Sequence, residues 1–168
     1  MSKRASILIG MAIGLLWSAG MLWVAANFVT LPVFTLIPTI MTAFLAPGIV
    51  LLLMIGRLAQ RRFFDHTIID GAPFAPGSGA EIDQRVLTNT TEQLVLGLCI
   101  WPASAVILAG AGPGVIVVLG LNFALARLLF WGGYHLSPPL RAFGFAASFY
   151  PTVLVAGWTL WALVTYGQ

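Results

Sequence analysis

Five long apolar runs dominate the hydrophobic pattern of the chain, and each is close to the length that crosses a bilayer. A transmembrane α-helix needs about 20 predominantly apolar residues, because the hydrocarbon core is about 30 Å thick. The pattern therefore predicts an all-α integral membrane protein whose 168 residues form a single membrane domain. The predicted helices cover residues 5–29, 33–56, 86–109, 115–133 and 142–165.

Small and cyclic residues inside the first two runs predict how these helices pack and bend. The first run is longer than the core of a signal peptide, which favours a spanning helix. Its Gly10 and Gly14 form a small-xxx-small pair that permits close approach of another helix, although glycine is also common in transmembrane helices generally. Pro38 and Pro47 lie within the second run, and we expect a kink there because proline removes a helical hydrogen bond.

One long polar segment, residues 57–84, connects the second and third predicted helices. Its glycines and prolines are typical of a loop. His66 has neither another histidine nor a cysteine nearby, so we predict no metal site. The acidic residues, which we expect to keep this loop solvated, are Asp65, Asp70, Glu81 and Asp83.

The basic residues all fall on one side of a five-span topology. That side contains Lys3, Arg4 and the segments 57–85 and 127–141. The opposite side, formed by the other two turns and the C-terminus, has no Lys or Arg. Because cytoplasmic loops are enriched in these residues, we predict a cytoplasmic N-terminus and a C-terminus outside. A four-span topology would divide the charges between the two faces.

The composition is that of a chain that lies almost wholly in the membrane. Hydrophobic residues make up 60% and charged residues 8%, whereas a soluble domain carries about 25% charged residues. The net charge of +3 is therefore no sign of a nucleic-acid partner. Cys99 is the one cysteine, which excludes an intramolecular disulfide. Its apolar surroundings favour a buried structural thiol over a reactive one.

Three polar residues at the start of the third run, Arg85, Asn89 and Glu92, are separated by four and then three positions. This spacing places a cation, an amide and a carboxylate on one helical stripe. A carboxylate within a transmembrane helix is costly, because lipid offers no water to solvate it. Glu92 therefore requires a partner, a ligand or a water-filled cavity.

Arg127, in the fourth run, is a candidate partner for Glu92. Glu92 lies seven residues inside its helix and Arg127 six residues before the end of the next, which places them at depths of about 10 and 9 Å. We expect the two charges to neutralise each other, either within one chain or between subunits.

Further polar side chains gather at the same cytoplasmic mouth: Arg85, Asn89, Tyr134 and Arg141, with Arg61 and Arg62 close by in the loop. Several cations, an amide, a phenol and one carboxylate suit a small zwitterion with several carboxylates. Arginine binds carboxylates through two parallel hydrogen bonds, and Glu92 could accept an amine.

The order and spacing of these residues resemble a known family. Arg85-x-x-x-Asn89-x-x-Glu92 is followed by Ala126-Arg127, Gly133-Tyr134 and a downstream Arg141. This arrangement is similar to the membrane-associated proteins in eicosanoid and glutathione metabolism (MAPEG), and the resemblance covers roughly residues 32–168. That family includes microsomal glutathione transferases, leukotriene-forming synthases and a non-catalytic lipoxygenase-activating protein.

The resemblance implies a four-helix subunit of a homotrimer that binds glutathione between neighbouring subunits at the cytoplasmic side. By position, Arg85, Asn89, Glu92 and Tyr134 would contact glutathione. Arg141 would stabilise the thiolate, and Arg127 would add a supporting charge. The predicted helix 5–29 would be an addition to a bacterial-type member in the inner membrane. Glutathione would be a co-substrate, and no metal is required.

Three departures from the family pattern bear on activity. Phe130 stands where several active members have tyrosine, Gln93 where some have an aromatic residue, and Leu87 where some have a polar one. Two functions remain open: a glutathione-dependent transferase or peroxidase acting on lipophilic electrophiles, and a non-catalytic lipid-binding or scaffold protein of the same fold. A third, a small transporter built on Glu92 and Arg127, has less support because one ion pair makes no pathway.

Overall fold

Long helices account for most of residues 2–166, the part of the chain that the computed structural model describes. Helices pair nearly all of their backbone N–H and C=O groups within one segment, as a bilayer requires. Five segments are long and apolar enough to cross a membrane, which confirms the predicted all-α, five-span fold of an integral membrane protein. The elements are α1 (Lys3–Phe28), the 3-10 turn η1 (Val33–Thr35), α2 (Leu36–Ala43), α3 (Leu45–Phe63), α4 (Gly79–Ile107), the 3-10 turn η2 (Ala109–Ala111), α5 (Gly112–Leu136) and α6 (Pro138–Tyr166).

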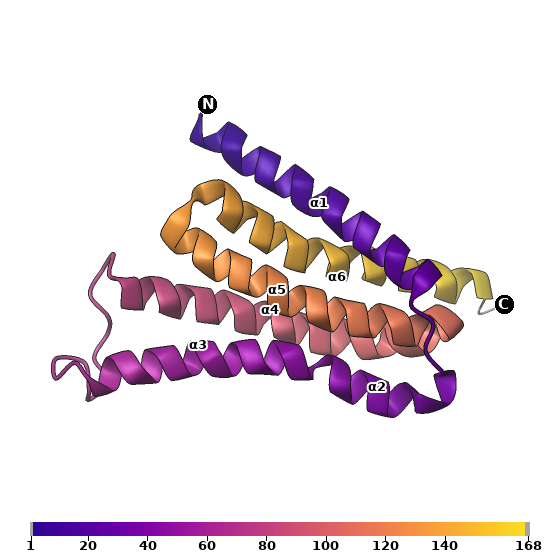
Figure 1. The fold of residues 1–168 in the computed structure, drawn as a ribbon, viewed down its shortest axis with the longest axis horizontal. Helices are drawn as coiled ribbons and strands as arrows, with labels where there is room; N and C mark the ends of the chain where they lie inside the picture. The colour runs from indigo at the N-terminus through magenta and orange to yellow at the C-terminus, as the bar shows by residue number, and fades with distance from the viewer. Residues whose placement is uncertain (1, 167–168) are drawn as a thin grey trace.

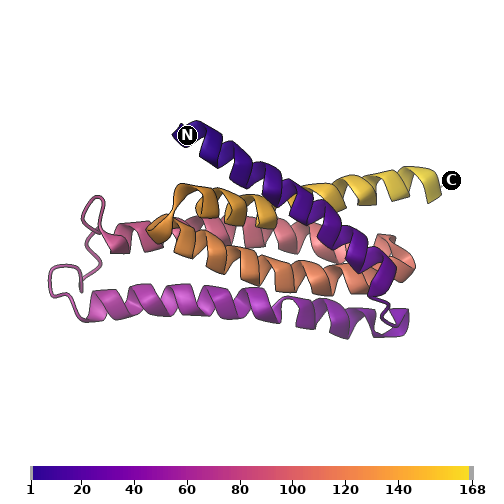
Figure 2. The ribbon, with the colours of Figure 1, turned by 45° about the horizontal axis from the view of Figure 1, so that its top comes forward.

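The helices run up and down, so that the connections alternate between two ends of the bundle (Figure 1). The start of α1, the α3–α4 loop and the α5–α6 turn lie at one end, which we call the charged end. The α1–α2 and α4–α5 connections lie at the other end. The Lys and Arg residues therefore gather at one end, as the sequence predicted. Both views place α1 and the α2–α3 segment on opposite sides of the bundle (Figure 2).

Proline divides the second span at the position where a kink was expected. Helix α2 ends at Ala43 and α3 begins at Leu45. Pro47 has no N–H to offer the Ala43 carbonyl, which is four residues earlier. Gly120 of α5 packs directly against this free carbonyl: a Cβ at Gly120 would lie 1.9 Å from the Ala43 oxygen. The kink thus brings the second span into close contact with α5.

A second proline, Pro151 in α6, frees a backbone carbonyl that is bonded by a chain of side-chain hydrogen bonds joining three helices. We call this chain the relay. Pro151 leaves the Ala147 carbonyl without its helical donor, and the Asn122 side chain of α5 donates to that oxygen at 2.7 Å. The indole N–H of Trp17, in α1, donates in turn to the Asn122 Oδ1 at 2.7 Å. The relay fixes the first helix to the rest of the bundle through polar groups.

Helix α1 packs on α6 through its small residues. A Cβ at Gly10 would lie 2.6 Å from the Pro139 carbonyl oxygen, and a Cβ at Gly14 would lie 2.5 Å from the Ala146 Cβ. The small-xxx-small pair is therefore confirmed as a helix contact, since no larger residue fits at either position without a shift.

Helices α3 and α4 extend well beyond their apolar runs, to Phe63 and from Gly79. Ser78 caps α4 by accepting from the Glu81 N–H at 3.1 Å, and Glu81 reaches back to accept from the N–H of Gly77, one residue before the cap, at 2.6 Å. This is a variant of the capping box, in which the glutamate accepts from the cap residue itself. The irregular connection is accordingly shorter than the predicted 57–84 loop, because hydrophobicity marks where lipid contact ends and not where the helix ends.

Candidate functional site

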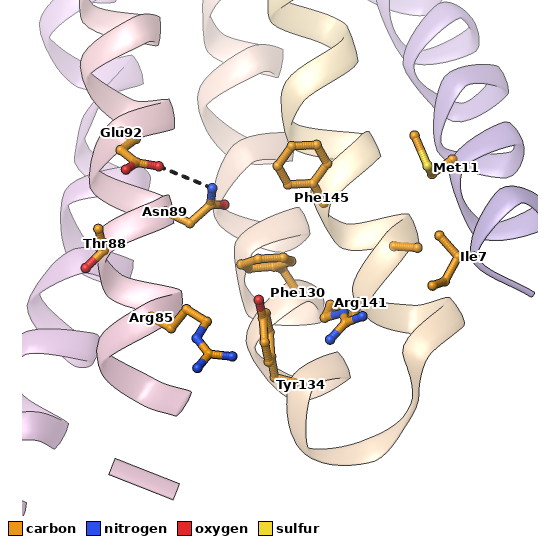
Figure 3. A pocket seen from close by; sticks show the side chains of 11 residues that line it. Ile7, Met11, Arg85, Thr88, Asn89, Glu92, Phe130, Tyr134, Arg141 and Phe145 are labelled. Atoms are coloured by element: carbon orange, nitrogen blue, oxygen red, sulfur yellow. Dashed lines mark hydrogen bonds between the residues drawn. The ribbon is translucent and has the colours of Figure 1, made fainter. Parts of the chain in front are cut away.

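The charged end contains a cavity of about 630 Å³ between α1, α4, α5 and α6 (Figure 3). This volume is within the range of about 300–1,000 Å³ that small-molecule sites occupy. Five of the six predicted site residues line it, and the sixth, Arg127, lies behind the wall. The lining residues are Ile7, Met11, Arg85, Thr88, Asn89, Glu92, Phe130, Tyr134, Arg141, Ala142 and Phe145.

Helix α4 supplies the polar wall of the cavity. Arg85, Thr88, Asn89 and Glu92 follow one another at helical spacing and line the cavity, with the Arg85 and Asn89 side chains directed into it (Figure 3). The Asn89 amide N–H donates to a Glu92 carboxylate oxygen at 3.4 Å. Arg85 forms an exposed ion pair with Glu81 at 2.7 Å. Exposed pairs of this kind contribute little, about 0–1 kcal/mol, so the Arg85 guanidinium is readily available to a ligand.

Arg127 is fully buried, with 0% of its surface exposed, and its partners are neutral. Its guanidinium donates to the Thr90 Oγ1 at 3.0 Å, to the Ser148 Oγ at 3.2 Å and to the Asn89 Oδ1 at 2.9 Å. It also lies 4.0 Å from the centre of the Phe130 ring. Within residues 2–166 no ion pair joins Arg127 to Glu92, so the expectation of that pair inside one chain was wrong. Equal depth on adjacent helices does not place two side chains on facing surfaces.

Arg127 determines the orientation of Asn89. A guanidinium has donors only, so Asn89 must turn its carbonyl oxygen toward Arg127 and its NH₂ group toward Glu92 and the cavity. Ser148, which accepts from Arg127, donates in turn to the Gln93 Oε1 at 2.8 Å. Gln93 therefore faces α6 and not the cavity, which removes it as a direct determinant of what the cavity binds.

Tyr134 and Arg141 form the wall at the α5–α6 turn. The Arg141 guanidinium carbon lies 4.9 Å from the centre of the Tyr134 ring, and Figure 3 shows both side chains directed into the cavity. Glycine permits this proximity: a Cβ at Gly133 would lie 2.3 Å from the Arg141 backbone nitrogen. Among the residues that the structure describes, Arg141 has no ion-pair partner, so its charge remains available inside the cavity.

A buried carboxylate, Asp83, organises a second polar group that the sequence analysis did not foresee. Asp83 was expected to be solvated, but it is only 3% exposed. The reason is that α4 begins before Asp83 and turns its side chain toward α3 and α5. We call the following set the Asp83 cluster. Its contacts to Asp83 are Arg61 at 3.0 Å, Arg57 at 3.8 Å, the His135 Nε2 at 3.0 Å and the Trp131 indole N–H at 2.7 Å.

The Asp83 cluster removes one arginine from the mouth of the cavity. Arg61 was expected there but pairs with Asp83, and Arg62 donates to the Ala72 carbonyl of the loop at 3.1 Å. A signal for the cluster was present: Trp131 and His135 are four residues apart and so share one face of α5. Cys99 also differs from expectation, since it is exposed on α4 and not buried.

The fold and the cavity define the class: an integral membrane helical bundle with a cation-lined cavity at its charged end. Comparison with known proteins agrees, since the sequence model of the MAPEG family matches residues 35–161. The chain belongs to the MAPEG family. Helix α1, which ends at Phe28, lies outside the matched segment. No curated protein and no solved structure was found to match the chain.

Proposed function

We propose that this protein is a glutathione-dependent transferase or peroxidase that activates the glutathione thiol for attack on lipophilic electrophiles. The polar residues with which α4 lines the cavity, Arg85, Thr88, Asn89 and Glu92, are called the α4 stripe. The observation that carries the proposal is the position of Arg141, whose guanidinium faces the cavity opposite this stripe. A free thiol has a pKa of about 8.5, and an adjacent cation lowers the pKa by stabilising the thiolate. Membership of a family that includes such enzymes supports the same reading.

The cavity wall offers complementary groups for each end of glutathione. Arg85 and the Asn89 NH₂ group would bind its carboxylates, and Glu92 would accept its amine. Tyr134 and Arg141 would hold the sulfur. Arg127 acts indirectly in this scheme, because it fixes the Asn89 amide and adds positive potential behind it.

The reaction needs only the thiol and an acceptor. The thiolate sulfur donates an electron pair to an electrophilic carbon, and the leaving group departs with its bonding pair. With a hydroperoxide the sulfur attacks the terminal oxygen, the O–O bond breaks and the alcohol leaves after protonation. A second glutathione then converts the sulfenic acid to the disulfide and water. In both reactions Arg141 stabilises the attacking anion.

The single chain leaves one side of the site incomplete. Arg85, Thr88 and Glu92 line the cavity and yet remain exposed in the single chain, and a charged group exposed within the membrane is costly. A second copy covering these residues would remove that cost. This supports the homotrimer, with glutathione held between subunits, that the family leads us to propose. Arg127 is fully buried within its own chain and is therefore out of reach of Glu92 of a neighbouring subunit.

Lys and Arg gather at the end that holds the cavity, and the positive-inside rule therefore assigns this end to the cytoplasm. The N-terminus would be cytoplasmic and the C-terminus outside, in a bacterial inner membrane. Glutathione would then enter from the cytoplasm, and a lipophilic acceptor from the bilayer.

The test is the ultraviolet absorbance of thiolate when glutathione is added to the purified protein in detergent. We expect a thiolate signal in the unmodified protein and its loss in Arg141→Ala. Turnover should fall about 10²- to 10³-fold, as for removal of one electrostatic stabiliser elsewhere. Arg57→Ala is the matched control, because Arg57 is half-exposed and lies outside the cavity. A thiolate signal that persists in Arg141→Ala would reject the assigned role of Arg141.

A non-catalytic lipid-binding or scaffold protein is the second candidate. Phe130 favours it, because this ring places no hydroxyl in the cavity where several active relatives have tyrosine. The same titration separates the candidates: glutathione that binds without thiolate formation, or does not bind at millimolar concentration, supports the scaffold.

A further inference from the structure

Helix α1 contributes to the cavity although it lies outside the family-matched segment. Ile7 and Met11, four residues apart on α1, line the side opposite the α4 stripe (Figure 3). Ala142 and Phe145 of α6 continue this side. The lining is therefore divided into a polar wall from α4 and an apolar wall from α1 and α6.

The apolar wall is held in place by specific contacts. Gly10 and Gly14, on the adjoining face of α1, let this helix pack directly against α6 with no gap between them. Trp17 adds the hydrogen bond to Asn122 at 2.7 Å. These contacts fix the position of Ile7 and Met11 relative to the other lining residues. A surface that discriminates between ligands must be held in place in this way.

Arg141 lies at the boundary between the two walls. In Figure 3 its guanidinium lies between Tyr134 and Ile7, with the α4 stripe beyond Tyr134. A sulfur held at Arg141 would have the peptide part of glutathione on one side and the apolar wall on the other. The apolar wall offers no charged group. Burial against it therefore stabilises an alkyl or aryl substituent next to the reacting centre of the co-substrate.

We propose that Ile7 and Met11 form the subsite for the apolar substituent of the co-substrate, so that α1 determines which lipophilic electrophiles react. This inference rests on the proposed glutathione function. Met is suited to the role, because its unbranched, polarisable side chain adapts to ligands of different shape.

The proposal is tested by the equilibrium binding of S-alkylglutathiones, which carry an alkyl chain of increasing length on the sulfur and require no turnover. Each added methylene that becomes buried should strengthen binding about fourfold. In the double variant Ile7→Ala/Met11→Ala this dependence should fall to less than about twofold per methylene, while S-methylglutathione binds as before. Met11→Trp, which fills the subsite, should weaken only the long-chain members.

Leu8→Ala is the matched control, because Leu8 is on the same helix, is 64% exposed and does not line the cavity. It should retain the full chain-length dependence. A dependence that is equal in the double variant and in the unmodified protein would overturn the role of α1 and leave the proposed function intact. If not even S-methylglutathione binds the unmodified protein, both proposals fail together.

Discussion

Two buried charges near the charged end, Asp83 and Arg127, are stabilised in opposite ways. Asp83 is surrounded by two arginines and a histidine whose side chains are 30–50% exposed: Arg57, Arg61 and His135. Arg127 donates only to neutral groups, of which Thr90 is 0% and Ser148 2% exposed. The carboxylate is thus compensated by charge at the bundle end, whereas the guanidinium keeps its charge uncompensated beside the cavity.

The difference separates stability from function. The Asp83 cluster joins α3, α4 and α5, and none of its residues lines the cavity. The Arg127 network includes Asn89, which does line that cavity. We therefore expect substitutions at Asp83 to change the free energy of unfolding, and substitutions at Arg127 to change ligand binding.

The largest effect on stability is expected for Asp83→Ala. The variant leaves the indole N–H of Trp131 without its acceptor and places Arg61 next to an empty site. Removing one partner of a buried ion pair costs about 3–5 kcal/mol. We expect about 3 kcal/mol, since Arg61 and His135 can turn to water. The measurement is unfolding of the detergent-solubilised protein in denaturant, and an unchanged midpoint would show that the cluster is dispensable.

The five spans and the charged end were predictable because both depend on composition along the chain. The close approach at Gly10 and Gly14 and the kink at Pro47 were predictable too, since each follows from the covalent structure of one residue type. Such features do not depend on how one helix is rotated against another.

Side-chain partners depend on that rotation, and here sequence reasoning failed. Glu92 and Arg127 were placed at equal depth, yet Glu92 faces the cavity and Arg127 faces Thr90 and Ser148. Asp83 was assigned to a solvated loop because the helix was taken to begin with the apolar run. The Ser78-x-x-Glu81 pattern typical of a helix start was present in the sequence, and Ser78 caps the helix at this earlier position.

The next largest effect is expected for Arg127→Met, and it should appear in binding. The free energy of unfolding should change by less than about 1 kcal/mol, because the lost hydrogen bonds are offset by removal of a desolvated charge. Glutathione affinity should fall about 10- to 100-fold, since nothing then holds the Asn89 amide toward the cavity. Calorimetric titration measures the affinity, and Asp83→Ala, corrected for its folded fraction, serves as the control that should bind normally.

That expectation has a clear contrary result. If Arg127→Met unfolds as readily as Asp83→Ala and binds glutathione normally, the neutral network is a structural element and the contrast between the two charges disappears.

The smallest effect is expected within the Asp83 cluster, between its two arginines. Arg61 lies 3.0 Å from Asp83 and is 30% exposed, whereas Arg57 lies at 3.8 Å and is 50% exposed. Attraction weakens with distance and with access to water. Arg57→Ala should therefore lower the free energy of unfolding by less than about 0.5 kcal/mol, and Arg61→Ala by about 1–2 kcal/mol. Because salt screens exposed charges first, added salt should abolish the Arg57 contribution and spare most of that from Arg61. Equal losses in both variants would mean that Asp83 responds to the total charge at the bundle end and not to the one close contact.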